Sequence, residues 1–181
     1  MAAAAALGHC VRAGQNALMD ADNIGEAMDP LTIITERIDR EMTAFAEEFN
    51  RPPLSAIPSP YREALLSYVL RKAKRMRPAL FIFGYSGYSS SDPRHLYRSA
   101  IALEFLHEFV LIHDDIIDHS LLRRGAPALH TRFAQELART PGARVSAEDL
   151  AMVAGDVMYA VGINAFLAVD APPDRKLRAL E

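Results

Sequence analysis

Three aspartates near the middle of the chain are the residues best suited to chemistry, in the segment 113–118 (HDDIID). Asp114 and Asp118 are four residues apart, so on a helix they share one face, with Cβ atoms about 5–6 Å apart. Two carboxylates at that distance repel each other, and no basic residue lies between them. A divalent cation would relieve the repulsion, and ligation by oxygen alone suits Mg²⁺, which commonly completes its shell with waters and substrate phosphates.

The residues before this segment extend its polar face. His107 lies seven residues before Asp114, and Glu104 lies one turn earlier again, so all three face the same way. This polar stripe crosses an otherwise apolar helix, which suggests the lining of a cavity. An aspartate pair alone is more typical of a solvated helix face, but the apolar residues at 109–112 and 116–117 favour a functional site.

Two basic segments flank this helix, at 74–78 (KRMRP) and at 123–125 (RRG). Arginine can bind phosphate oxygens with two parallel hydrogen bonds, and lysine adds a point charge. A solvated run of charge is the alternative for both segments, and it is our interpretation of Arg71 and Lys72. Acidic residues between two basic clusters predict a Mg²⁺–diphosphate site.

Hydrophobic spacing predicts the helices that would position these residues. Asp29 and Pro30 are typical of a helix start, and apolar residues then recur at three- and four-residue spacing as far as Phe49. Ser146 is typical of a helix N-cap. Further helices are expected over 61–70, 78–85, 94–118, from about 131 to 141, and over 150–169. We find no convincing alternating strand, so the prediction is an all-α helical bundle.

Composition limits the possible classes of protein. The 181 residues include 20 basic and 23 acidic side chains, and a net charge of -3 argues against a nucleic-acid partner. The single cysteine, Cys10, excludes an internal disulfide and a cysteine-rich zinc site. No apolar run reaches the ~18–20 residues of a membrane span. No basic residue precedes Arg12, unlike a secretory signal, so we expect a cytoplasmic protein without a membrane span.

The two ends of the chain differ from the middle. Residues 1–28 lack a sustained hydrophobic period, which predicts a flexible tail or a start codon placed too early, and 29–181 form the helical unit. The segment 172–181 begins another helix that would have little to hold it. We therefore expect a truncated bundle.

These segments, in this order, resemble the motifs of the trans-isoprenyl diphosphate synthases, or polyprenyl synthetases. Residues 74–78 are similar to the family's G-K-R-x-R-P segment, with Ala73 where glycine is usual, and 104–118 are similar to its first aspartate-rich motif. Residues 123–130 are similar to its R-R-G-x-P-T-x-H stretch, and 154–156 to its Gly-Asp helix. The resemblance covers about 30–181 and implies the N-terminal half of a bundle of the isoprenoid synthase type.

The resemblance also implies a reaction. Members of the family condense isopentenyl diphosphate with an allylic diphosphate, whose C–O bond ionises with the help of Mg²⁺. Asp114 and Asp118 would be the main Mg²⁺ ligands, supported by Asp115, and Arg123 would contact the allylic diphosphate. The diphosphate of isopentenyl diphosphate would be held by Lys74, Arg77, His107 and Arg124. The family tends to dimerise, so a homodimer, or a heteromer with another prenyl synthase subunit, is expected.

Residues near these motifs are expected to be structural. Gly155 would permit a close approach of two helices, and Asp156 would accept a hydrogen bond. Structural roles are also expected for His113, His119 and His130. Phe109, five residues before Asp114, suggests a short to medium product by resemblance to the family.

Several alternatives remain open. No second acidic motif follows Asp118, and the family uses one for the other wall of its metal site, so little or no synthase activity is expected of this chain alone. The chain could instead be a non-catalytic partner subunit of a full-length synthase. An HD-type metal phosphohydrolase would use His107 and 113–114, but leaves the basic segments unexplained. A class I terpene cyclase shares the acidic motif without needing those segments.

Overall fold

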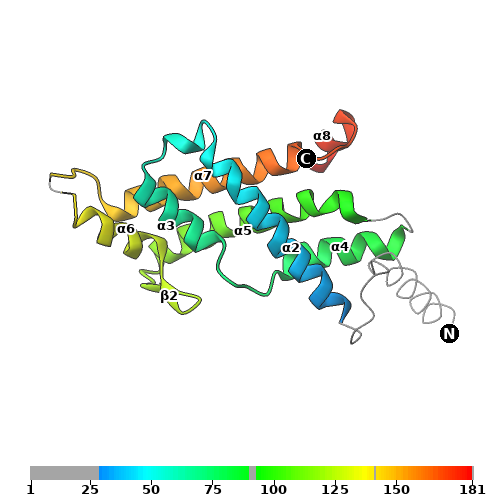
Figure 1. The fold of residues 1–181 in the computed structure, drawn as a ribbon, viewed down its shortest axis with the longest axis horizontal. Helices are drawn as coiled ribbons and strands as arrows, with labels where there is room; N and C mark the ends of the chain where they lie inside the picture. Colours follow the sequence, from blue (N-terminus) through cyan, green and yellow to red (C-terminus); the bar gives the residue numbers. More distant parts are fainter. Residues whose placement is uncertain (1–28, 90–92, 141, 181) are drawn as a thin grey trace.

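The computed structural model describes residues 29–89, 93–140 and 142–180. The elements, in chain order, are α2 (Pro30–Ala46), the 3₁₀ helices η1 (Glu47–Asn50) and η2 (Leu54–Ala56), α3 (Ser59–Val69), α4 (Met76–Tyr88), the 3₁₀ helix η3 (Pro93–Leu96), α5 (Tyr97–Ile117), β1 (Leu122–Arg123), β2 (Ala126–Pro127), α6 (Leu129–Leu137), α7 (Ala147–Leu167) and α8 (Pro173–Leu180). The all-α prediction is confirmed (Figure 1). The tail predicted for 1–28 lies outside the described residues.

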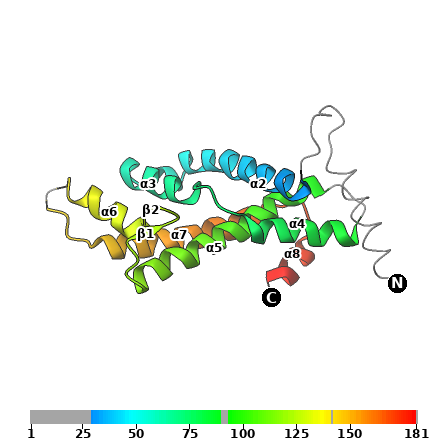
Figure 2. The same cartoon turned by 90° about the horizontal axis from the view of Figure 1, so that it is seen from below.

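Helices α5 and α7 form the centre of the bundle and run antiparallel along each other (Figures 1 and 2). Helix α2 packs on α4 and α5, and α4 also packs on α5. Helix α3 packs on α6, and α6 packs on α7. The pairs α2–α4 and α3–α6 therefore pack against the central pair. The buried side chains of α2 recur every three or four residues, as the sequence predicts: Ile34, Ile38, Met42 and Phe45. Burial of such a stripe holds an amphipathic helix in place.

Two glycines on α7 allow it to approach α5 closely. A Cβ on Gly155 would lie 2.3 Å from Cε1 of His113, and a Cβ on Gly162 would lie 3.0 Å from Cγ of Leu106. The structural role predicted for Gly155 is therefore confirmed. Among the described residues, no hydrogen bond of the kind predicted for Asp156 is seen: its exposed carboxylate lies 3.7 Å from Nε2 of His113, beyond hydrogen-bond distance.

The three histidines with predicted structural roles have different surroundings. His113 hydrogen-bonds through Nδ1 to the carbonyl of Phe109 at 2.9 Å, which fixes its ring within α5. His130 is buried, and its Nδ1 has no hydrogen-bond partner among the described residues. His119 is exposed and follows α5 with a left-handed φ of 52°. The structural interpretation is thus supported most directly for His113.

Helix boundaries follow the predicted order, with shifts of a few residues. Helix α4 begins at Met76, so Pro78 is its third residue, where the missing N–H has no partner within the helix anyway. Ser146 caps α7 as predicted, because its Oγ accepts the N–H of Asp149 at 3.0 Å. The predicted irregular segment after α5 contains a two-stranded antiparallel hairpin, β1–β2. With two residues in each strand, alternation of residue types cannot reveal it.

One described helix, α7, is long and apolar enough to cross a membrane by length and composition. The helix contains Asp149 and Asp156, so it is not an uninterrupted apolar run. A third of its most apolar window is buried in the bundle, and core helices of soluble proteins pass the same test.

Candidate active site

The C-terminal end of α5 presents two carboxylates to solvent. Asp114 and Asp118 are exposed, and the N–H of Asp118 donates to the carbonyl of Asp114 at 2.8 Å, so the pair keeps the helical spacing. Within the described part of the chain, neither side chain has a hydrogen bond or an ion pair. The negative end of the helix dipole adds to their mutual repulsion. Both effects favour a bound cation at this end of α5.

Asp115, between them, is buried and 1% exposed. Its Oδ2 accepts a hydrogen bond from the hydroxyl of Tyr68 at 3.0 Å, and its Oδ1 accepts from Nε of Arg123 at 2.8 Å and from Nη2 of the same arginine. The hydrogen bond to Asp115 raises the pKa of Arg123, whereas burial raises the pKa of Tyr68. Asp115 therefore holds Arg123 within electrostatic range of Asp114, and both of its carboxylate oxygens are already engaged in hydrogen bonds.

Further back on α5, Glu104 and Glu108 form a buried ion-pair cluster with two arginines. Nη1 of Arg75 donates to Oε1 of Glu104 at 2.7 Å, and Nε of Arg75 donates to Asp39 of α2 at 2.8 Å. Nη1 of Arg124 donates to Oε1 of Glu108 at 2.7 Å. The polar stripe predicted that Glu104 lines a cavity. The residue is instead 2% exposed and forms an ion pair with Arg75 inside this cluster. The cluster joins α2, α5, the start of α4 and the hairpin.

Arg124 and Gly125 form the two-residue turn of the hairpin. Leu122 pairs with Pro127 and Arg123 with Ala126, which leaves Arg124 at φ 52° and Gly125 at φ 74°. Two positive φ values are the signature of a type I′ turn, the form that matches the twist of the flanking strands. The turn places the neighbouring arginines in different environments, Arg123 against Asp115 and Arg124 against Glu108.

The basic residues in and next to the loop before α4 differ in how deeply they are buried. Arg75 caps α4 with a left-handed backbone (φ 47°) and is 2% exposed, while Lys74 and Arg77 are exposed. Burial, followed by the positive charge of Arg77, lowers the pKa of His107 on α5. Arg124 and Arg123 lower that pKa further, so the predicted substrate-binding residues Arg77, Arg123 and Arg124 all lie within electrostatic range of His107.

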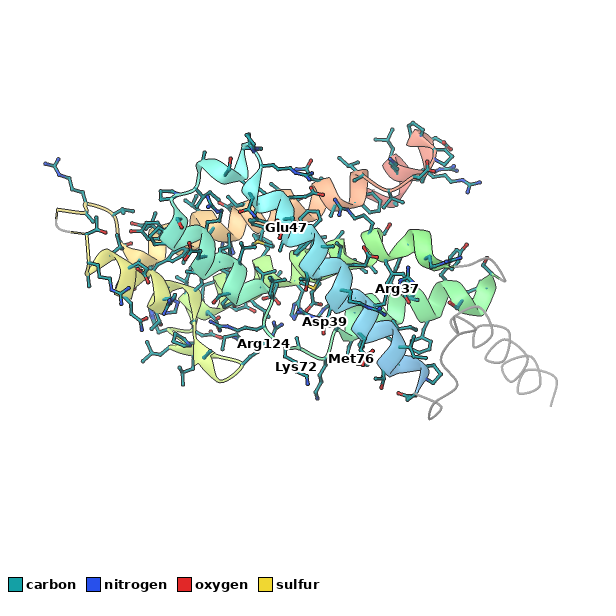
Figure 3. The ribbon with its side chains drawn as sticks, in the orientation of Figure 1. Arg37, Asp39, Glu47, Lys72, Met76 and Arg124 are labelled. Atoms are coloured by element: carbon teal, nitrogen blue, oxygen red, sulfur yellow. The ribbon has the colours of Figure 1, made fainter. Side chains whose placement is uncertain are left out.

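Arg71 corrects the sequence interpretation. Instead of being a solvated charge, its guanidinium donates to the carbonyls of Arg123 at 3.0 Å and Pro127 at 2.8 Å, and it lies over the ring of Tyr68. Arg71 therefore fastens the hairpin to the end of α3. Lys72 is exposed, as expected. Asp39, Lys72, Met76 and Arg124 lie along one side of the bundle in Figure 3.

Four residues of the site were not identified from the sequence: Tyr68, Asp39, Arg75 and Glu108. Tyr68 and Asp39 lie far from the motifs in the chain, and no spacing rule joins them to Asp115 or Arg75. The run at 71–77 contains five basic residues, and composition alone does not show which are buried. The i,i+4 spacing of Glu104 and Glu108 was a usable signal for the second glutamate.

The chemistry of the exposed donors fits Mg²⁺ better than a softer metal. The described residues contain no group of three or more His, Cys, Asp or Glu side chains that could hold a metal ion. Asp114 and Asp118 nevertheless offer two unpaired carboxylates, and Mg²⁺ often binds one or two carboxylates while keeping waters and phosphate oxygens. Phe109, the residue expected to influence product length, is half-buried, and its ring packs against those of Tyr159 and His113.

The sequence matches the family model described as "Polyprenyl synthetase" over residues 59–179, and the chain belongs to that family. It is 33% identical over 113 residues to geranylgeranyl pyrophosphate synthase of Geoglobus acetivorans, an alignment covering 62% of this chain and 31% of that protein. It is 32% identical over 114 residues to heptaprenyl diphosphate synthase component 2 of Geobacillus stearothermophilus, covering 63% of this chain and 35% of that protein.

Solved structures agree with this assignment. Geranylgeranyl pyrophosphate synthetase from Pyrococcus horikoshii superposes with a TM-score of 0.61 at 28% identity, covering 83% of this chain and 40% of that chain. A geranyltransferase from Helicobacter pylori, at 21% identity, shares the fold with a TM-score of 0.58, over 86% of this chain and 51% of that chain. The bundle is therefore of the isoprenoid synthase type, as expected. The chain spans about a third of the length of the curated relatives described above.

Proposed function

We propose that this chain forms the diphosphate-binding and metal-binding half of a prenyltransferase site in isoprenoid biosynthesis. The proposal rests mainly on a contrast at the C-terminal end of α5 between exposed carboxylates and a neighbouring arginine that is held in place. Two carboxylates without partners among the described residues face solvent there, and one of them, Asp114, lies within electrostatic range of Arg123, which the buried Asp115 holds. An allylic diphosphate and isopentenyl diphosphate are the proposed substrates. The family membership and the likeness to geranylgeranyl diphosphate synthases support this choice.

Each residue of the site has a proposed role. Asp114 and Asp118 would hold Mg²⁺, which when bound would supply charge neutralisation for the departing diphosphate. Arg123, oriented by Asp115, would bind the allylic diphosphate and stabilise its negative charge as the C–O bond breaks. Binding of the diphosphate of isopentenyl diphosphate is assigned to Lys74, Arg77, His107 and Arg124.

The lowered pKa of His107 fits a role as a neutral hydrogen-bond donor to phosphate. A neutral imidazole has one N–H, which can be directed at an oxygen of the ligand. The positive charge needed for the diphosphates then comes from the lysine and arginines. His107 would fix orientation, and the basic side chains would supply most of the attraction.

We further propose that a second polypeptide surface completes the site. One acidic motif is present, and apolar side chains on α4, α5 and α7 are exposed, among them Phe81, Val110, Ile117 and Val153. Apolar residues in such number favour association with another surface. A homodimer or a heteromer with a prenyl synthase subunit would cover them. A non-catalytic role in such a heteromer is the second candidate, and one matched relative is named as a component of a synthase.

Binding of inorganic pyrophosphate tests the proposal directly. Isothermal titration calorimetry should show binding that needs Mg²⁺ and that weakens by more than about tenfold in a variant carrying Asp114→Asn and Asp118→Asn, because replacing even supporting groups of metal sites costs that much. Asp170→Asn, an exposed aspartate after α7, is the matched control and should bind like the wild type. Equal binding by all three proteins would contradict the proposal.

Prenyl transfer by the isolated chain provides a separate test of completeness. With a single acidic motif, we expect no elongation of an allylic diphosphate by the pure protein. Addition of a family member that restores or changes the product would support the partner-subunit role. Efficient transfer by the pure chain would contradict the need for a second surface.

A further inference from the structure

Arg124 occupies a backbone conformation that needs support. Its φ of 52° lies in the left-handed region, which is unfavourable for side chains other than those of glycine, asparagine and aspartate. Type I′ turns prefer Asn, Asp or Gly at this position, and the chain has arginine. Such strain persists when surrounding contacts hold the residue in place.

Glu108 makes the contact that can hold Arg124. Its side chain is fully buried, and its Oε1 accepts the Nη1–H of Arg124 at 2.7 Å. The second oxygen, Oε2, has no hydrogen-bond partner among the residues described. Arg75 stands 3.9 Å from Oε1 of Glu108 and is itself fixed by Glu104 and Asp39. Glu108 is thus anchored inside the bundle and reaches outward to a single hairpin residue.

We propose that Glu108 is a positioning residue for diphosphate binding: from inside the bundle it holds Arg124 in its left-handed turn, so that the remaining N–H groups of that guanidinium stay directed at the ligand. This inference rests on the proposed function. A guanidinium carries five N–H donors, so Arg124 can bond to Glu108 and keep others for phosphate oxygens. Glu108 itself does not touch the ligand.

The direction in which anion affinity changes on removal of Glu108 distinguishes a positioning role from a purely electrostatic one. When ionised, Glu108 places a negative charge beside the proposed anion-binding cluster, so loss of that charge alone would strengthen binding of an anion. Removal of a positioning contact would weaken the same binding, because Arg124 would lose its fixed orientation. Glu108→Ala removes both the charge and the acceptor, whereas Glu108→Gln keeps an oxygen that can accept from Arg124.

The first experiment measures hydrogen exchange across 121–128 without ligand. The N–H of Ala128 bonds to the carbonyl of Leu121 at 2.9 Å and closes the hairpin, so its exchange reports hairpin order. Exchange should speed up in Glu108→Ala, return most of the way toward the wild-type rate in Glu108→Gln, and stay unchanged in Glu48→Ala, which removes the carboxylate paired with Arg98 elsewhere. Unchanged exchange in Glu108→Ala would overturn the positioning role.

The second experiment measures affinity for inorganic pyrophosphate with Mg²⁺ in the same proteins. Glu108→Ala should bind about tenfold more weakly, equivalent to ~1.4 kcal/mol, with partial recovery in Glu108→Gln. Tighter binding by Glu108→Ala would overturn the inference. A wild-type chain that binds no pyrophosphate would instead contradict the proposed function, while the exchange result would still decide whether Glu108 orders the hairpin.

A third measurement uses the wild type only, so it still tests the inference if the Glu108 variants fail to fold. In ¹⁵N spectra of the wild type, the guanidinium of Arg124 should show hindered rotation and protected Hη protons. Arg144, exposed in the loop before α7 and without an ion pair among the described residues, is the internal reference and should rotate freely. Equal mobility of the two groups would overturn the inference.

Discussion

Helix α5 carries two carboxylate pairs with the same spacing and opposite surroundings. Glu104 and Glu108 are buried and bonded to Arg75 and Arg124, whereas the Asp114–Asp118 pair is exposed and bonded to no described side chain. The i,i+4 spacing by itself does not distinguish them. Their partners do, because a buried carboxylate with an arginine is already neutralised, and an exposed pair remains available to a cation.

The largest expected loss of stability comes from replacing Arg75, the arginine that joins the buried Glu104 to Asp39. Arg75→Met leaves Glu104 and Asp39 without their partner, and breaking a buried ion pair in this way typically costs about 3–5 kcal/mol. Urea denaturation should show a loss of that order. Lys72→Met, in the same loop but at an exposed position, should change the unfolding free energy by less than about 0.5 kcal/mol. Similar stability of both variants would remove the contrast between the two pairs.

The pH dependence of stability should reveal Glu108. Burial raises the pKa of Glu108 to about 7, from an ordinary 4.5, against the opposing effect of Arg124. Its neighbours are Arg124 on the hairpin, Arg75 at the start of α4, Glu104 on α5, and Tyr68 and Arg71 at the end of α3. Between these two pKa values the folded protein binds more protons than the unfolded chain. The contribution of this group is therefore fully present below the unfolded pKa and is lost as pH rises through 7.

The expected size of this pH effect is up to about 3 kcal/mol, because a difference of one in pKa between the folded and unfolded chain corresponds to about 1.36 kcal/mol. Chemical denaturation at a series of pH values should show the decline in the wild type. Glu108→Gln cannot ionise, so the difference between the two proteins isolates the contribution of Glu108. Parallel stability curves for the two proteins would show that Glu108 titrates normally.

The smallest expected changes in stability come from the neighbouring residues Asp114 and Asp115. They test most directly whether a buried and an exposed carboxylate on α5 have different roles. Asp115→Asn weakens the bonds to Arg123 and Tyr68 and should cost about 1–3 kcal/mol, because buried groups are left poorly satisfied. Asp114→Asn should leave stability unchanged or raise it by about 0.2–0.5 kcal/mol, because it relieves repulsion by Asp118. Thermal unfolding without Mg²⁺ measures both. A larger loss for Asp114→Asn than for Asp115→Asn would reverse the proposed assignment of roles.

The parts of the molecule that follow from local sequence could be predicted. Hydrophobic period and capping residues indicate the helices, with Ser146 an explicit case, and Gly155 was identified as a close contact. The acidic and basic motifs indicated which segments form the candidate site.

Long-range partners could not be predicted. Asp39 meets Arg75 across 36 residues, and Tyr68 meets Asp115 across 47, so no local pattern connects them. The left-handed backbone at Arg75 accompanies burial of that guanidinium beside exposed Lys74 and Arg77, and a run of basic letters does not reveal that difference. Arg71 was misinterpreted for the same reason.

The two glycines of α7 have a mechanical consequence for the site. They are seven residues apart, as are the residues they face, His113 and Leu106, so each contact fixes the same alignment of the antiparallel pair. Neither helix can slide along the other without a collision, and the acidic end of α5 is held at a constant height on α7. The hairpin, by contrast, is held by side-chain hydrogen bonds with Arg71, Asp115 and Glu108, so its position depends on contacts that a single substitution can remove.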